Sequence, residues 1–266
     1  MNHTITSPLI SIVIPHYNCS RYLEKTLISI QRQVYRNIET IIVDDGSIDS
    51  EKRIALDLAL KYDASFVDLK HNSGLSVARN EGIQKSHGEW LLMLDSDDLL
   101  MPKAISNLVS LIRPNDLMIS GLLLSVPKNF EYPDNMIALL IALLNRSVLH
   151  SNFLRFWKFL WLNHNSQPWR CFSNTSSLYS RDLFRKVGLY DEALRWAEDS
   201  EFKERIIRSI GILPKRCWQL IYLYRIHPYQ MTKGDKPRNI FYIYRQNLER
   251  RLNNGIDSTN TRLLVN

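Results

Sequence analysis

Short apolar runs alternate with segments of helical periodicity along the first half of the chain. Buried strands are predicted for four apolar, partly β-branched runs: LISIVI (9–14), ETIIVD (39–44), SFVDL (65–69) and EWLLML (89–94). Helices are predicted where apolar residues recur at three- and four-residue spacing, over about 20–33, 51–62, 74–86 and 102–112. Strands that alternate with helices of this length indicate an α/β fold, with a mostly parallel sheet covered by helices.

The second half of the chain has fewer regular patterns. WAEDSEFKERIIRS (196–209) predicts a helix that opens on acidic residues, and LIYLYRI (220–226) predicts a strand. Two pairs at i, i+4 spacing favour a solvent-exposed face for that helix: Glu201 with Arg205, and Glu204 with Arg208.

Residues 136–162 form the most hydrophobic and aromatic part of the chain. Neither MIALLIALLNRSVL (136–149) nor FLRFWKFLWL (153–162) reaches the roughly 18–20 apolar residues that a membrane-spanning helix needs. Buried helices are the preferred interpretation. The alternatives are a surface-lying amphipathic segment, with Arg155 and Lys158 facing lipid phosphates, and a lid over a lipid-linked acceptor.

Carboxylates cluster where two of the predicted strands end. The strand at 89–94 runs directly into Asp95, Ser96, Asp97 and Asp98. One acid is enough to cap the following helix, and Asp98 is placed to do so. Asp95 and Asp97 project to the same side of an extended chain and suit one hard divalent ion that completes its shell with substrate phosphates. A metal–diphosphate site is therefore preferred over a purely structural turn.

The tip of the strand at 39–44 carries a second acidic group. In VDDGSIDS (43–50), Asp45 is placed to accept a hydrogen bond from a ribose hydroxyl or a base N–H, and a helix-capping turn explains the stretch equally well. No dinucleotide fingerprint and no P-loop motif is present. In HNSGLSVARN (71–80), Arg79 is the only cation with access to a diphosphate, unless it is a solvated helix residue.

Charge and cysteine content narrow the function classes. The 266-residue chain has a net charge of +7, which favours anionic partners, but a basic surplus does not explain the acidic cluster, so nucleic acid ranks last. The three cysteines are widely spaced and fit a reducing compartment. Since no signal-peptide pattern is visible, a cytoplasmic location is expected, with peripheral contact at the inner face of the plasma membrane as a further expectation.

The chain resembles the family 2 glycosyltransferases of the GT-A fold. Six stretches carry the resemblance, in order over most of residues 9–232: SIVIPHYN (11–18), IIVDDGSIDS (41–50), NSGLSVARNEGI (72–83), WLLMLDSDD (90–98), VGLYDEALRWAEDSEFKERI (187–206) and YRIHPYQMT (224–232). Where the family commonly has Ser, this chain has Gln230. The resemblance implies a GT-A domain over 1–235, with a nucleotide-sugar half (about 1–124), a helical acceptor-side and catalytic half (125–235), and a basic helical tail (236–266).

The resemblance also implies roles for the matching residues. The nucleotide-sugar pocket would be lined by Pro15, Tyr17, Asn18, Asp45, Asn72, Arg79, Asp95 and Ser96. A divalent ion, Mn²⁺ or Mg²⁺, would be held by Asp97, Asp95 and His227. Asp199 would be the general base, with Glu198 supporting it. From the residues alone, capping of the helix explains the latter two acids as well, and a structural role explains His227.

The leading hypothesis is an inverting, metal-dependent hexosyl- or N-acetylhexosaminyltransferase. Its donor would be a nucleoside-diphosphate sugar with a UDP-type nucleotide. Its acceptor would be a glycan or a lipid-linked saccharide in polysaccharide biosynthesis. Two alternatives remain. A nucleotidyltransferase would usually carry a glycine-rich loop where this chain reads PHYNCSRYLEK (15–25). A non-catalytic sugar-nucleotide-binding module of a larger assembly is the other.

Overall fold

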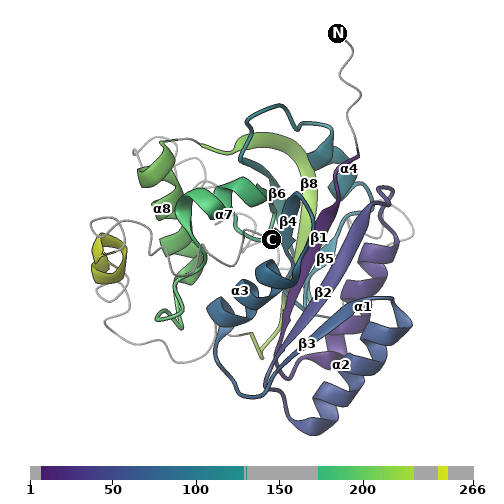
Figure 1. The fold of residues 1–266 in the computed structure, drawn as a ribbon. Coiled ribbons are helices and arrows are strands. Elements are labelled where there is room, and N and C mark those ends of the chain that lie inside the picture. Colours follow the sequence, from purple (N-terminus) through teal and green to yellow (C-terminus); the bar gives the residue numbers. More distant parts are fainter. Residues whose placement is uncertain (1–6, 129, 131–172, 212, 231–244, 251–266) are drawn as a thin grey trace.

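A computed structural model describes residues 7–128, 130, 173–211, 213–230 and 245–250 (Figure 1). Within them, eight strands form one sheet in the order β3-β2-β1-β4-β7-β6-β8-β5. The strands span Ile10–His16 (β1), Ile38–Asp45 (β2), Ser65–Leu69 (β3), Trp90–Met93 (β4), Leu99–Leu100 (β5), Met118–Pro127 (β6), Ser177–Ser180 (β7) and Lys215–Ile226 (β8). The carboxyl ends of β1 and β2 lie along the lower edge of the sheet in Figure 1.

The sheet has a parallel part and a mixed part. β1 pairs in parallel with both β2 and β4, and β2 pairs in parallel with β3. The four strands predicted from the apolar runs therefore form the predicted parallel sheet. Beyond β4, the antiparallel strand β7 pairs with β6, β6 pairs in parallel with β8, and β8 pairs antiparallel with the short β5. The β5–β8 pairing brings the end of β8 beside the acidic stretch that follows β4.

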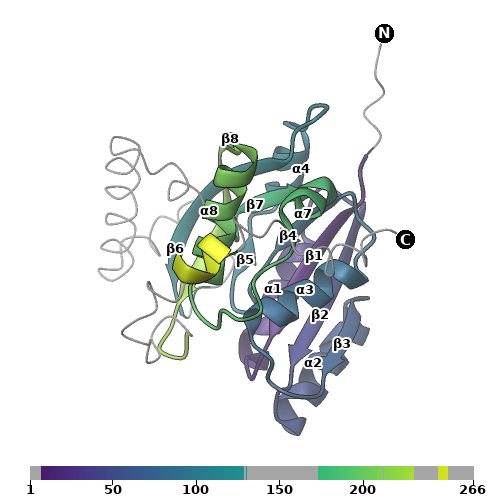
Figure 2. The ribbon, with the colours of Figure 1, turned by 60° about the vertical axis from the view of Figure 1, so that its left-hand side comes forward.

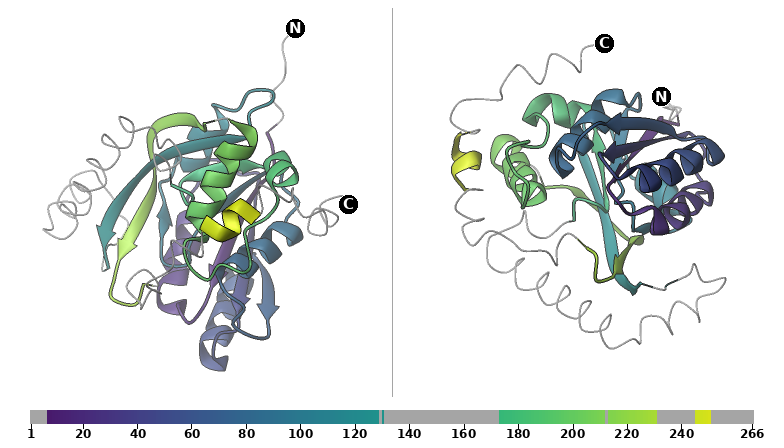
Figure 3. Two further views of the ribbon diagram at one scale, coloured as in Figure 1. Left: turned by 90° about the vertical axis from the view of Figure 1, so that its left-hand side faces the viewer. Right: turned by 90° about the horizontal axis from the view of Figure 1, so that it is seen from below.

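Helices cover both faces of the sheet. They span Ser20–Gln31 (α1), Asp49–Lys61 (α2), Leu75–Lys85 (α3), Ala104–Val109 (α4), Arg181–Val187 (α7) and Glu198–Ile210 (α8). Because side chains alternate along a strand, β1 sends Ile12 to a core under α1, α2 and α4, and Val13 to a core under α3, α7 and α8. Viewed from below in Figure 3 (right), α7 and α8 lie on one side of the sheet and α1 on the other.

Two predictions from helical periodicity are wrong in detail. The helix predicted over about 20–33 ends earlier, since α1 ends at Gln31, and the side chain of the nearby Val34 is exposed. The Glu201–Arg205 pair lies in the core rather than on a solvated face, since neither residue exceeds 2% exposure. The Arg205 guanidinium donates to the carbonyl oxygens of Val187 and Leu189, at and beyond the end of α7. Charge spacing along a helix cannot distinguish this internal tie from a surface ion pair.

Much of the acceptor-side region and of the tail lies outside the described residues, including 136–162. Residues 245–250 are helical and lie beside α8 (Figure 2), where Leu248 is buried and Glu249 accepts a hydrogen bond from Arg208. None of the helices in the described part of the chain combines the length and apolar character that a bilayer crossing requires.

Candidate active site

The stretch that follows β4 is held by the end of β8. The Asp98 carboxylate is fully buried. It accepts hydrogen bonds from the Tyr222 hydroxyl at 2.7 Å and from the backbone N–H of Arg225 at 2.8 Å. The Arg225 side chain donates from Nε to the carbonyl oxygen of Asp97 at 2.8 Å. Asp98 is thus neither the pocket residue nor the helix cap that the sequence allowed. Burial, together with the charges of Asp97 and Asp95, raises its pKa well above the usual range.

Asp97 and His227 meet at the carboxyl edge of the sheet. The distance from Asp97 Oδ2 to His227 Nε2 is 2.7 Å, and the imidazole is almost fully buried while the carboxylate keeps 19% exposure. The backbone N–H of Tyr229 donates to His227 Nδ1 at 3.3 Å, so Nε2 is the nitrogen that faces the carboxylate. One accessible carboxylate and one oriented imidazole fit a divalent ion that draws its remaining ligands from water and phosphate. Among the described residues, no group of three such side chains forms a complete metal cage.

Gln230 occupies the position at which this chain departs from the family pattern. Its side-chain amide donates to the carbonyl oxygen of Arg225 at 2.7 Å, and its amide oxygen accepts the His227 N–H at 3.3 Å. The Gln230 side chain therefore stabilises the turn that carries His227 by bonding to the backbone of that turn. The family pattern did not predict these contacts, because the Ser that is common at this position is too short to make them.

Arg79 joins the acidic stretch to the start of α8. Its two terminal nitrogens donate to Asp95 Oδ1 at 3.2 Å and to Glu198 Oε1 at 3.0 Å. The side chain is 3% exposed, and the guanidinium also lies 5.3 Å from the ring centroid of Tyr190. The structure thus excludes the solvated-helix interpretation of Arg79, and the expected direct contact with a diphosphate is not open to its two terminal nitrogens in this arrangement.

The two acids at the start of α8 differ in environment. Glu198 is buried, which raises its pKa to about 7 despite the neighbouring Arg79 charge. Asp199 keeps 42% side-chain exposure and lies 3.7 Å from Lys203. Burial alone would raise its pKa, but the Lys203 and Arg79 charges outweigh that effect and hold the pKa below its usual value. Asp199 is therefore an ionised, solvent-accessible carboxylate beside the site, and Glu198 is an internal group.

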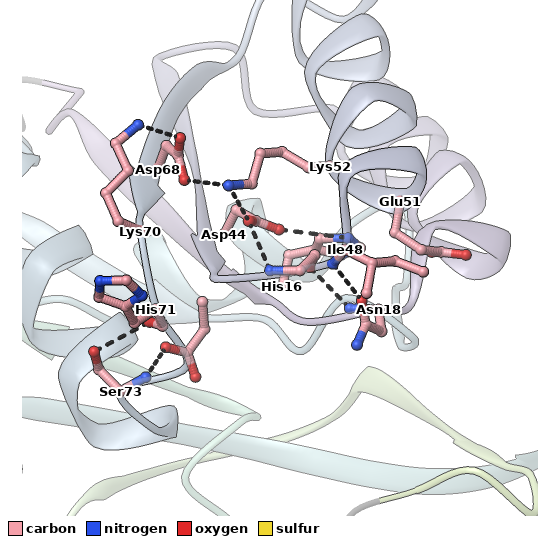
Figure 4. Close-up of polar contacts among 12 residues, drawn as sticks. His16, Asn18, Asp44, Ile48, Glu51, Lys52, Asp68, Lys70, His71 and Ser73 are labelled. Atoms are coloured by element: carbon pink, nitrogen blue, oxygen red, sulfur yellow. Dashed lines mark hydrogen bonds and ion pairs between the residues drawn. The ribbon is translucent and has the colours of Figure 1, made fainter.

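The third acidic position, Asp45, ends β2 and is 5% exposed. Its two carboxylate oxygens accept the backbone N–H groups of Ser73 at 2.7 Å and Gly74 at 2.9 Å. Figure 4 shows the Ser73 contact and the neighbouring ends of β1 and β2. A side chain at Gly46 would come 2.4 Å from the backbone of His71, so the two turns pack directly on each other.

The other residues expected in the nucleotide pocket lie on the same edge in different environments. Asn18 has a positive φ of 47° and ties the first turn to the second, since its side chain accepts the Ile48 N–H at 3.0 Å. Tyr17 is half-exposed, at 49%. Pro15 is buried within β1 opposite Val43, and Ser96 is 7% exposed. Tyr17 and Asn18 thus line the surface of this edge, whereas Pro15 and Ser96 lie beneath it.

Two residues without a predicted role, Asn80 and Arg195, fasten the segment before α8 to α3 and to the turn that precedes α3. The Asn80 amide donates to the carbonyl oxygen of Tyr190 at 3.0 Å and accepts the Tyr190 N–H at 2.9 Å. Arg195 reaches Asn72 (described below). Both residues lie inside stretches that matched the family, but nothing in their spacing pairs them, since each partner is more than a hundred positions away.

The raised pKa of Glu198 predicts a pH-dependent stability. Its folded pKa of about 7 exceeds the ordinary value of 4.5, so the folded state binds a proton more tightly than the unfolded chain. The stabilising contribution is complete below about pH 4.5 and is lost as pH rises through about 7. Glu198→Gln should therefore melt progressively higher relative to the wild type between pH 5 and 8. Melting scans across that range test this, and a constant difference would contradict it.

Comparisons with known proteins agree with this architecture. The family model described as glycosyl transferase family 2 matches residues 11–188. An uncharacterized glycosyltransferase, EpsJ of Bacillus subtilis, is 30% identical over 233 residues, which cover 85% of this chain and 63% of that protein. An uncharacterized glycosyltransferase of Rickettsia typhi is 27% identical over 245 residues, covering 87% of this chain and 68% of that protein.

Solved structures share the fold. S. aureus TarS in complex with UDP-GlcNAc has a TM-score of 0.68 and 18% identity, with 96% of this chain and 70% of that chain covered. Mannosyltransferase PcManGT from Pyrobaculum calidifontis, in complex with GDP-Man and Mn²⁺, has a TM-score of 0.60 and 16% identity, with 97% and 73% covered. The GT-A architecture expected from the sequence is confirmed, and the chain belongs to glycosyl transferase family 2.

Proposed function

We propose that this chain is an inverting, metal-dependent glycosyltransferase that moves a sugar from a nucleoside-diphosphate donor to a glycan or lipid-linked saccharide. The observation that carries the proposal is the presence of two separate groups, one at the carboxyl edge of the sheet and one at the start of α8. One is the Asp97–His227 contact of 2.7 Å, and the other is the accessible carboxylate of Asp199. Metal-assisted sugar transfer needs one group to hold the ion and a different one to take the acceptor proton.

Asp97 and His227 would hold a divalent ion, Mn²⁺ or Mg²⁺. When bound, the ion would offset negative charge on the diphosphate as it departs. Asp95 accepts a hydrogen bond from Arg79, which fixes its orientation. It would therefore add negative charge beside the ion. The Mn²⁺ reported for the mannosyltransferase complex supports the class of cofactor.

Asp199 would act as the general base. The acceptor hydroxyl oxygen forms a bond to the anomeric carbon, on the face opposite the diphosphate. The bond from that carbon to the diphosphate oxygen breaks, its electron pair leaves with the diphosphate, and the hydroxyl proton passes to Asp199. A single displacement inverts the anomeric configuration. Glu198, whose carboxylate is 6% exposed and bonded to Arg79, is less accessible for this transfer.

A UDP-type donor is proposed because Asp45, at the end of β2, supplies a carboxylate, the acceptor that a base N–H requires. Complexes of S. aureus TarS with UDP and UDP-GlcNAc support this choice. The chain spans 63% of the length of the B. subtilis relative. The acceptor and any membrane contact are therefore proposals about the whole protein.

The proposal predicts that Asp97→Asn weakens metal activation. With a UDP-sugar donor, the Mn²⁺ concentration for half-maximal activity should rise by about 10–100-fold, as for loss of a group that binds or orients a metal. Chelation should remove activity from the wild type, and added Mn²⁺ should restore it. Glu249→Gln, an exposed acid beside α8, serves as the control and should match the wild type.

The products decide between function classes. Transfer with release of a nucleoside diphosphate supports the proposal, whereas release of pyrophosphate would indicate a nucleotidyltransferase. Donor binding without hydrolysis or transfer, across a panel of glycan and lipid-linked acceptors, would indicate a binding module. Undiminished turnover of the wild type after chelation would refute the metal dependence.

A further inference from the structure

Arg79 was expected to contact the donor nucleotide with its positive charge, but its position does not favour this contact. Arg79 is buried between Asp95 and Glu198 and makes an ion pair with each. If a positively charged side chain contacts the nucleotide beside Asp45, it must come from another element. The segment that leads into α8 supplies one.

Arg195 reaches across to the turn that holds Asp45. Its terminal nitrogens donate to Asn72 Oδ1 and to the Asn72 carbonyl oxygen, both at 3.3 Å. A side chain at Gly74 would lie 3.9 Å from Arg195 Cγ, so the arginine stem passes over this turn. Ser73 and Gly74, the next two residues, donate their N–H groups to Asp45. Arg195 and Asp45 therefore flank the same short turn.

The charges of these two groups are coupled. Burial raises the pKa of Asp45 overall, whereas the positive charge of Arg195 acts to lower it. The Arg195 side chain is exposed, and the two bonds to Asn72 use only part of the donor capacity of a guanidinium, which has about five N–H donors. The exposed Arg195 guanidinium and the Asp45 carboxylate, which is 5% exposed, thus lie at the same short turn, and the two N–H contacts of Asp45 use only part of the acceptor capacity of a carboxylate, which has about four acceptor positions.

We propose that Arg195 reads the nucleobase together with Asp45, with Arg195 donating to a base carbonyl oxygen while Asp45 accepts the adjacent base N–H. This inference rests on the proposed function. The pair is complementary to bases in which an N–H stands beside a carbonyl, which are uracil, thymine and guanine. Cytosine offers a bare ring nitrogen at that position and places an acceptor against the Asp45 carboxylate. Arg195 therefore selects the donor as well as binding it.

The test measures nucleotide binding by calorimetry with UDP and CDP, in the presence of Mn²⁺. The variants are Arg195→Ala and Arg195→Gln, and the control is Arg185→Ala, an exposed arginine on α7 whose partner is Asp182. The wild type should prefer UDP over CDP. Arg195→Ala should raise the Kd for UDP by about tenfold and bring the UDP/CDP ratio close to one, while Arg185→Ala leaves both unchanged.

Two outcomes overturn the inference. If Arg195→Ala binds UDP within twofold of the wild type, Arg195 does not contact the donor. If UDP and CDP weaken equally, Arg195 only supports the Asn72–Gly74 turn. Asp45→Asn separates this failure from that of the proposed function: a wild type that binds no nucleotide, or an Asp45→Asn variant that binds UDP normally, shows that the donor site itself was misassigned.

Discussion

Replacing Asp199 by Asn is expected to lower kcat by about 10²–10⁴-fold while leaving donor binding nearly unchanged. The Asn amide keeps the size of the side chain but cannot accept the proton of the acceptor hydroxyl. Asp199 keeps 42% exposure, and its charge partner is Lys203, on the same helix, so loss of its charge should not unfold the chain. Donor contacts are proposed for other elements, which is why the effect should appear in kcat.

Initial rates at saturating donor, together with calorimetric titration of UDP, measure this prediction. Asp182→Asn on α7, where the carboxylate is 64% exposed, is the matched control and should retain wild-type rates. A kcat within about threefold of the wild type would exclude Asp199 as the base. If Glu198→Gln alone abolished transfer, the assignment would pass to the neighbouring acid.

Replacing Arg79 by Gln is expected to destabilise the fold by about 3–5 kcal/mol. The guanidinium is 3% exposed and pairs with Asp95 and with Glu198, so its removal leaves buried negative charge without compensation. Because the Arg79 charge lowers the pKa of Glu198, the variant should also shift that pKa above about 7. Chemical denaturation monitored by circular dichroism at pH 7 measures the loss of stability.

A double variant makes this prediction specific to the ion pair. Glu198→Gln removes one of the uncompensated charges, so Arg79→Gln/Glu198→Gln should lose less stability than the sum of the two single variants. Additive losses, or a loss below about 1 kcal/mol for Arg79→Gln, would show that Arg79 acts mainly by packing against Tyr190.

The parallel half of the sheet was predictable because its signals are local. β3 matches its predicted range at both ends, and β1, β2 and β4 differ by one or two residues. In the mixed half, the strand predicted at 220–226 is confirmed as the end of β8, whereas β5 has two residues and is a strand only through its pairing with β8. No periodicity arises from two residues, and its partner lies more than a hundred positions away.

The candidate site shows the same division. The acids at the strand ends were identified from the sequence, because unexplained charge beside an apolar run is visible without a structure. The contacts that the charged residues of the site make inside the fold could not be identified from the sequence. Asp98 and Arg79 are both charged residues within motifs, yet one holds β8 and the other joins two acids, and only their partners on distant elements distinguish these roles. Arg195 gave no local signal for the same reason, and Gln230 stood out only as a departure from the family pattern, which does not reveal its contacts.

The contacts that hold the candidate site together also determine when the site can form during synthesis. His227 lies 130 positions after Asp97, Glu198 lies 119 after Arg79, and Tyr222 lies 124 after Asp98. At ribosomal rates of about 5–20 residues per second, the acids of the β4 tip precede their partners by roughly 6–26 s. The parallel half can pair its strands in that interval, but Asp98 has no donor from β8 until the strand emerges. Refolding of the complete chain should therefore be slow, since these long-range closures come last.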